Sequence, residues 1–144
     1  MSGFGQSGSV VSVSNQMSDE SSVSFSQNLV WIDSLQLITA SGELFNHVDA
    51  SLPMCAGSGD RIVRVRATFT VPFSDTPCVN VGLNGLDAAH DQNLRFRLDT
   101  VDVTPFGFVI EFVTWGDTHI ARACVSWQAI GSSAGRQKTR RKQD

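Results

Sequence analysis

The chain lacks several features that would assign it to a common class of protein. It has no run of about 18 consecutive apolar residues, so the sequence predicts no membrane-spanning helix. Residues 1–6 lack the basic and then apolar pattern of a secretory signal peptide. We therefore expect synthesis in the cytoplasm without membrane insertion, and any release or display on a particle or cell surface by another route.

Charge is scarce and of mixed sign. Charged residues make up 17% of the chain, below the usual share of about a quarter. The 11 Lys and Arg residues against 14 Asp and Glu residues give a net charge of -3, which argues against nucleic acid as a partner. Basic residues are densest in residues 136–144, and we interpret this stretch as a solvated tail rather than a nucleic-acid contact.

Cysteine and histidine are too few and too dispersed for a metal site. The three cysteines are Cys55, Cys78 and Cys124. They show no metal-ligand spacing, and the three histidines form no cluster with them. We expect free, buried or half-buried thiols, and neither a metal nor a cofactor.

Catalytic motifs are also missing. The chain has no Gly-x-Ser-x-Gly motif, and Gly57-Ser58-Gly59 is not followed by the lysine that a phosphate-binding loop requires. Asp87 and Asp91 could pair for glycoside chemistry, but solvation of a short polar loop explains them more simply. We expect that the protein is not an enzyme.

What the chain does contain is strand periodicity. No helical period exceeds about two turns, whereas apolar residues alternate with Arg and Thr between Asp60 and Val71. Further alternating runs follow, separated by turn signals such as Pro105-Phe106-Gly107. Short strands with turns every 8–12 residues or so are typical of an all-β sandwich.

Composition divides the chain into three parts. Residues 1–27 are rich in Ser and Gly and predict an arm, either flexible or swapped onto a neighbour; their short alternating Val pieces also suit an attachment segment of a larger assembly. Residues 28–131 form the predicted sandwich, with a turn at Ser41-Gly42 and a loop at Pro53–Asp60. Residues 132–144 form the basic tail.

Two tryptophans near the end of the predicted sandwich differ in their surroundings. Trp127 alternates with apolar partners and is predicted to be in the core. Trp115 lies between two predicted strands and is followed by Gly116-Asp117-Thr118. An open indole offers the apolar surface that a sugar's C–H groups require, while Arg and Asp supply strong hydrogen bonds to hydroxyls. Trp115 and Arg95 are therefore candidates for sugar binding.

Several motifs between about Arg64 and Ile130 carry a family resemblance. They are Leu86-Asp87, Gln92-Asn93-Leu94-Arg95, Val103-Thr104-Pro105-Phe106-Gly107-Phe108, Thr114-Trp115-Gly116-Asp117-Thr118 and Val125-Ser126-Trp127. Together they resemble the H-type lectin domain, the family of the snail agglutinin and the C-terminal domain of the discoidins. The resemblance implies a six-stranded antiparallel β-sandwich that assembles as a homotrimer or a stacked hexamer. It also implies metal-free recognition of galactose or N-acetylgalactosamine between subunits.

The resemblance also assigns site residues. The family's sugar-binding arginine and loop tryptophan correspond to Arg95 and Trp115. The next position, a sugar-contacting histidine in the snail agglutinin, is Gly116, and Asp117 completes the loop. A pocket aromatic corresponds to Ala121. The family's carboxylate falls on Ser58 without a gap or on Asp60 with a two-residue gap, and we prefer Asp60 because a carboxylate can accept two hydroxyls.

Two functions are compatible with these residues. The first is a trimeric module that binds surface glycans for adhesion. The second is a structural or adaptor protein, such as a fibre or spike component of a phage-like particle, that keeps the sandwich with a weakened or lost sugar site. The replacements at Gly116 and Ala121 favour the second.

Overall fold

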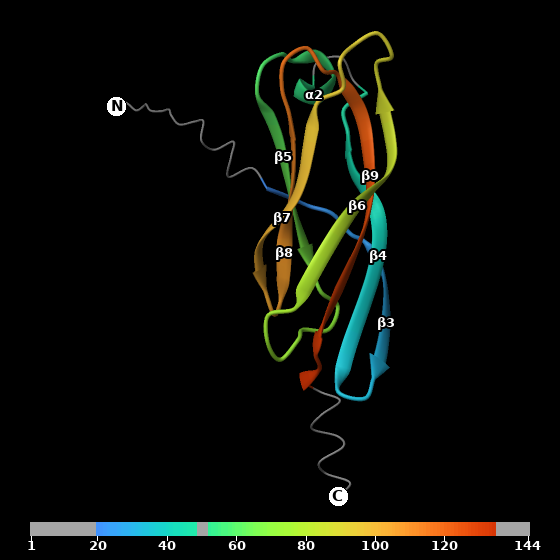
Figure 1. Ribbon diagram of the computed structural model, residues 1–144, viewed down its shortest axis with the longest axis vertical. Coiled ribbons are helices and arrows are strands. Elements are labelled where there is room, and N and C mark those ends of the chain that lie inside the picture. Colours follow the sequence, from blue (N-terminus) through green and yellow to red (C-terminus); the bar gives the residue numbers. More distant parts are fainter. Residues whose placement is uncertain (1–19, 49–51, 135–144) are drawn as a thin grey trace, which may run out of the picture.

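The computed structural model describes residues 20–48 and 52–134. Within them, two four-stranded sheets stack into an elongated sandwich, with loops gathered at its two ends (Figure 1). The all-β prediction is confirmed. The predicted number of six strands is wrong, because the described residues form eight, and two of these begin in the segment expected to be an arm.

The first sheet, called here the β5–β8 sheet, has the strand order β2-β5-β8-β7. Its strands are β2 (Ser21–Ser22), β5 (Arg61–Thr68), β8 (Gly107–Thr114) and β7 (Phe96–Thr104). The β2–β5 pair is parallel, whereas the β5–β8 and β7–β8 pairs are antiparallel.

The second sheet, called here the β4–β9 sheet, has the strand order β3-β4-β9-β6 and is antiparallel throughout. Its strands are β3 (Ser26–Ile32), β4 (Leu35–Asn46), β9 (Ile120–Ser132) and β6 (Cys78–Ala88). The helix α2 (Pro53–Ala56) is a single turn that lies between β4 and β5 in the chain. No helix in the described part of the chain is long and apolar enough to span a membrane.

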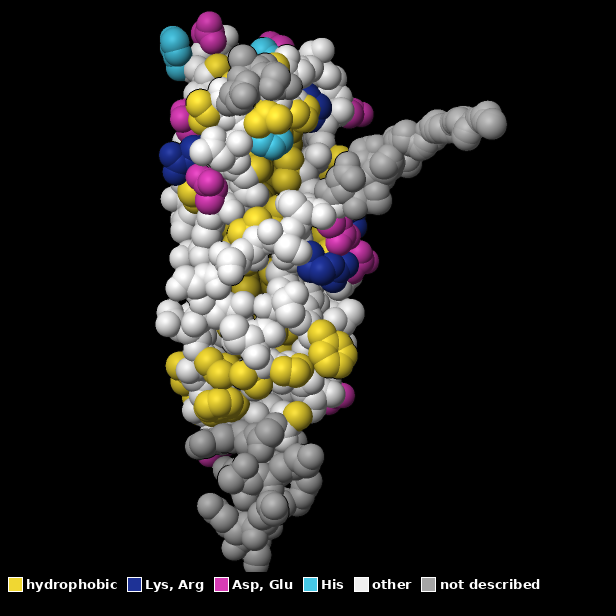
Figure 2. Space-filling model, turned by 180° about the vertical axis from the view of Figure 1, so that it is seen from behind, with side chains coloured by type: hydrophobic (Ala, Val, Ile, Leu, Met, Phe, Trp, Pro, Cys, Tyr) yellow, Lys and Arg dark blue, Asp and Glu magenta, His cyan; other side chains and the backbone are white. Residues whose placement is uncertain are grey.

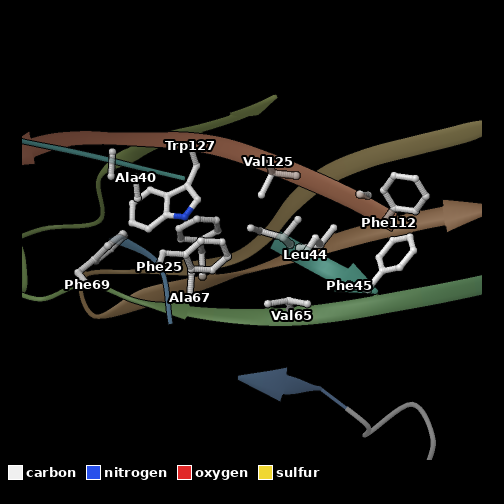
Figure 3. Close-up of a cluster of buried hydrophobic side chains, with 14 of the residues drawn as sticks. Phe25, Ala40, Leu44, Phe45, Val65, Ala67, Phe69, Phe112, Val125 and Trp127 are labelled. Carbon is white, nitrogen blue, oxygen red and sulfur yellow. The ribbon is translucent and has the colours of Figure 1, made fainter. Parts of the chain in front are cut away.

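The core lies between the two sheets and is rich in aromatic rings (Figure 3). Trp127 is only 3% exposed, so its predicted core position is confirmed. Its ring meets the rings of Phe25 and Phe108 edge-on, with centroids 5.8 and 5.0 Å apart. Farther along the sandwich, Phe45 packs against Phe112 in the same way. Edge-to-face contacts of this kind add to the free energy gained by burying the rings.

The sandwich begins earlier than the sequence predicts. Phe25 is 8% exposed and packs on Trp127. Gln27 donates through Nε2 to the carbonyl of Thr68 at 2.8 Å and accepts from the backbone N–H of Thr70 at 3.0 Å. Residues 20–27 therefore belong to the sandwich, ahead of the predicted boundary at residue 27, and the rest of the predicted arm lies outside the described residues.

The predicted turn at Ser41-Gly42 is wrong, because both residues lie within β4. A β-carbon at Gly42 would lie 2.8 Å from Cδ1 of Phe25, closer than real side-chain contacts allow. The glycine is therefore required by close packing of the Phe25 ring against the strand, rather than by a change of chain direction.

The expected short polar loop that holds both Asp87 and Asp91 is also wrong, because Asp87 lies on β6. Strand β6 continues to Ala88, and Asp87 pairs with Arg122 of β9. Asp87 therefore lies on a strand instead of in a loop with Asp91. The three cysteines are free thiols, with Cys55 and Cys124 half-buried and Cys78 exposed.

Candidate functional site

A groove lies on the outward face of the β5–β8 sheet, at the end where β5 and β7 begin and β8 ends. Its volume is about 360 Å³. The residues that line it are Asp60, Arg61, Ile62, Arg97, Val113 and Trp115. Two of them, Asp60 and Trp115, are among the site residues that the sequence predicts.

The floor of the groove is apolar because of the strand register. Ile62 pairs with Val113, and Val113 pairs with Arg97, so the three side chains stand in one row across β5, β8 and β7. Ile62 is 49% exposed, although the outward positions that follow it on β5 are Arg and Thr. Trp115 stands just beyond the end of β8 and is 38% exposed. The groove thus offers aliphatic and indole surface to solvent.

Asp60 supplies the groove with a carboxylate that is free to accept hydrogen bonds. It is exposed and immediately precedes β5. Within residues 20–48 and 52–134, the structure gives its side chain neither a hydrogen bond nor an ion pair. Ser58, the alternative position for the family's carboxylate, is also exposed but does not line the groove.

The other predicted site residues form a cluster beside the groove. Nη1 of Arg95 lies 2.8 Å from Oδ1 of Asp117, and the Asp117 side chain is 68% exposed. A β-carbon at Gly116 would lie 3.2 Å from Nη1 of Arg95, and Gly116 has a φ of 71°. Arg95 therefore fills the space where a larger residue at position 116 would project, and the positive φ disfavours any side chain there.

Two buried threonines hold this cluster to the strand ends. The hydroxyl of Thr114 donates to the carbonyl of Arg95, and the hydroxyl of Thr118 donates to the carbonyl of Asn93. The Thr118 hydroxyl also accepts from the backbone N–H of Arg95 at 3.1 Å. The backbone that carries Arg95 is therefore fixed relative to the Trp115 loop. Ala121 lies apart on β9 and does not line the groove.

Four residues that line the groove were not predicted from the sequence. Ile62 carries a signal that could have been used, since it is an apolar residue on an outward face otherwise occupied by Arg and Thr. Val113 and Arg97 enter the groove only through the register of β7, β8 and β5. Arg61 offers no signal at all in the sequence, because its hydrogen-bond partners are backbone carbonyls distant along the chain.

Residues 64–130 match the family model of the H-type lectin domain. The protein "ATP synthase subunits region ORF 7" of Fuscovulum blasticum is 48% identical over 79 residues, which cover 55% of this chain and 69% of that protein. Discoidin-2 of Dictyostelium discoideum is 28% identical over 76 residues, which cover 52% of this chain and 30% of that protein.

A solved structure shows the same fold. The native structure of recombinant discoidin II of Dictyostelium discoideum superposes with a TM-score of 0.60 at 20% identity. The superposition covers 73% of this chain and 41% of the discoidin II chain. This chain therefore spans less than half of the discoidin, and the likeness concerns the sandwich alone.

Proposed function

The chain belongs to the H-type lectin domain family, and from this premise we propose that it binds surface glycans of the galactose or N-acetylgalactosamine type, or related sugars, through the groove beside Trp115. One observation carries the proposal: an exposed indole and an unpaired carboxylate face the same groove over an aliphatic floor. This combination suits a sugar, which has both apolar C–H patches and hydroxyl donors.

Each part of the groove has a role in this proposal. The indole of Trp115 packs against the C–H face of the sugar ring, and Asp60 accepts hydrogen bonds from two of its hydroxyls. Arg95 and Asp117 offer a donor and an acceptor at the side of the groove. Their ion pair is exposed, so it contributes little to stability, and a hydroxyl can take the place of either partner at small cost.

Binding without hydrolysis suits the charges of the groove. Asp60 is the only carboxylate among the described residues that line it. Hydrolysis of a glycosidic bond generally uses two carboxylates on opposite sides of the scissile bond. We therefore propose a binding module and not an enzyme.

Assembly as a homotrimer, or as a stacked hexamer, is part of the same proposal. The outer face of the β4–β9 sheet carries one row of apolar or thiol side chains across all its strands: Val30, Leu37, Ile130 and Cys78. Val30 and Ile130 are 49% and 39% exposed. Apolar surface of this kind is favourable to bury against other copies of the chain. Several grooves in one assembly would then raise the avidity for a glycan-covered surface.

A glycan array followed by titration of the strongest binder tests the sugar proposal. We expect Asp60→Asn, which removes the charge but keeps the shape, to weaken binding about tenfold or more, since charge-assisted hydrogen bonds contribute roughly 1.5–3 kcal/mol. Ser58→Ala is the matched control and should bind as the unaltered protein does. An array without any bound glycan would refute the proposal. A loss of binding in Ser58→Ala but not in Asp60→Asn would assign the acceptor role to Ser58 instead of Asp60.

The second candidate is a structural or adaptor protein, such as a fibre or spike component of a particle. The observation in its favour is that Arg95 is already paired with Asp117 over Gly116, so the family's arginine has a partner within the chain. Co-purification with a large particle, lost on deletion of residues 1–19, would support this function. That deletion removes none of the described sandwich. A freely soluble assembly that binds glycans equally well with and without residues 1–19 would count against it.

A further inference from the structure

Arg61, the first residue of β5, is a buried cation held entirely by backbone carbonyls. It is 9% exposed. Its Nε donates to the carbonyl of Gly59 at 2.9 Å, and its Nη2 donates to that of Gly116 at 3.0 Å. Its Nη1 donates to the carbonyls of Thr118 at 2.8 Å and Pro53 at 3.4 Å. Within the described residues no carboxylate forms an ion pair with it.

The burial of this guanidinium is favourable only when the carbonyls are in place. A buried charge without hydrogen-bond partners is strongly disfavoured, and the planar fork of arginine can satisfy several acceptors at once. Here the acceptors come from three separate segments: helix α2, the loop of residues 57–60 and the loop of residues 115–118. Arg61 therefore couples the positions of these segments to one another.

The segments that Arg61 joins are those that carry the proposed sugar site. Asp60 lies between Gly59 and Arg61, and Trp115 directly precedes Gly116. A backbone hydrogen bond from Gly59 N–H to the Gly116 carbonyl, 3.0 Å long, also joins the two loops. A β-carbon at Gly57 would lie 2.8 Å from Cδ of Arg61, so the first loop closes tightly over the side chain.

We propose that Arg61 is the positioning residue of the groove: it holds Asp60 and Trp115 in the arrangement that a sugar requires. The proposal rests on the function proposed above and adds the device that organises the site. Removal of Arg61 loosens both loops, so binding must then order them, and affinity falls although the direct sugar contacts remain in the chain.

The test uses the full chain with Arg61→Met and Arg61→Lys, and Arg66→Met as the control. Arg66 lies on the same strand, is exposed and pairs with Glu20 away from the groove. The first readout is the dissociation constant for the glycan selected on the array. The second is acrylamide quenching of Trp115 fluorescence in a Trp31→Phe background, where the only other indole is the buried Trp127.

We expect Arg61→Met to weaken binding about tenfold or more, a change of roughly 1.4 kcal/mol, and to increase quenching of Trp115. Arg61→Lys should recover part of both, because lysine keeps the charge but not the fork. Arg66→Met should change neither. Circular dichroism confirms that each variant is folded.

Two results would overturn the proposal. One is a folded Arg61→Met protein with unchanged affinity and unchanged quenching; if Arg61→Met does not fold, the same result for Arg61→Lys decides. The other is an equal loss in Arg66→Met. If the unaltered protein binds no glycan, the proposed function fails, and the quenching series alone still decides whether Arg61 orders the Trp115 loop.

Discussion

The two sheets share one aromatic core but present very different outer faces to solvent. The outer face of the β5–β8 sheet is charged: Arg64 lies within ion-pair distance of Glu20, Asp102 and Glu111, and Arg66 pairs with Glu20. Its end carries the groove. The middle of the other sheet's outer face is uncharged. For the molecule as a whole, Figure 2 shows a band of hydrophobic side chains toward the lower end and a further group near the upper end.

The β4–β9 face changes character row by row. The apolar row through Leu37 and Ile130 is followed by a row of Asn28, Thr39, Gln128 and Asn80, and then by a row of small residues around Ser126. The first cross-strand charge pair is Glu43 with Arg122, at 2.9 Å. The residue types on the inner faces are constrained by the shared core. Those on the outer faces depend on what each sheet contacts, whether solvent, ligand or another chain. The difference favours glycan contact on one face and self-association on the other.

The largest effect is expected from a charge placed in the apolar row of the β4–β9 sheet. We expect Ile130→Glu to convert the proposed homotrimer to single chains, because a carboxylate buried without a partner is strongly disfavoured. Light scattering after size-exclusion chromatography measures the mass. Thr68→Glu, on the outer face of the other sheet, is the control and should keep the assembly intact. An assembly lost in Thr68→Glu but kept in Ile130→Glu would reverse the roles of the two faces.

The shared core can be probed at two glycines of the β4–β9 sheet. A β-carbon at Gly42 would press on Phe25, whereas one at Gly82 would meet nothing within 4 Å. We expect Gly42→Ala to lower the free energy of unfolding by roughly 1–3 kcal/mol, the usual range for overpacking. Gly82→Ala should leave it nearly unchanged, as measured by urea denaturation.

A double variant sharpens the same experiment. Phe25→Leu should recover part of the loss in Gly42→Ala, because the smaller side chain makes room for the new methyl group. If the two substitutions are simply additive, the close packing of Phe25 on β4 does not explain the glycine.

Acid should weaken the end of the sandwich that carries the groove. Burial lowers the pKa of His47 below its ordinary value, and its Nδ1 accepts from the backbone N–H of Met54 at 3.3 Å. The unfolded chain then binds this proton more readily than the folded chain does. Stability is therefore fully present above the unfolded pKa of about 6.5 and falls as the pH drops below it.

Thermal melts between pH 7.5 and 5 measure this effect. His47→Gln should flatten the pH dependence, while the exposed His90→Gln should leave it as it is. A pH dependence that persists in His47→Gln would assign it to other groups.

The smallest effect is expected on the charged face. Arg66→Ala removes the ion pair with Glu20 at 3.1 Å, in which the Arg66 side chain is 44% exposed. Exposed pairs of this kind contribute roughly 0.2–1 kcal/mol, and salt screens them. We expect a small loss of stability at low salt that disappears in 1 M NaCl; a loss that persists in salt would indicate packing rather than charge.

Much of the fold could be predicted from the sequence because strand alternation is clear after Asp60. The core position of Trp127 followed from its apolar neighbours on the same face. The early strands could not be predicted in the same way. The Ser-rich composition around Phe25 gives no sign that its ring is buried. Ser41-Gly42 is typical of a turn, whereas the structure requires a glycine there because of its close packing against Phe25.

The candidate site was only partly predictable. Asp60 and Trp115 both line the groove, whereas Arg95 and Asp117 form an ion pair beside it. Arg61 could not be found from the sequence, since its acceptors are carbonyls up to 57 residues away. Every residue has a backbone carbonyl, so the pattern of side chains does not indicate which carbonyls accept hydrogen bonds from Arg61.

Two tryptophans of equal exposure allow a direct test of the groove as the sugar site. Trp115 and Trp31 are each 38% exposed, but only Trp115 lines the groove. Titration of the selected glycan should show that Trp115→Ala weakens binding roughly 30-fold or more, equivalent to about 2 kcal/mol, the scale of an aromatic residue at the centre of a binding site. Trp31→Ala should bind as the unaltered protein does. Equal binding by folded Trp115→Ala, or a comparable loss in Trp31→Ala, would contradict the assignment of the groove as the sugar site.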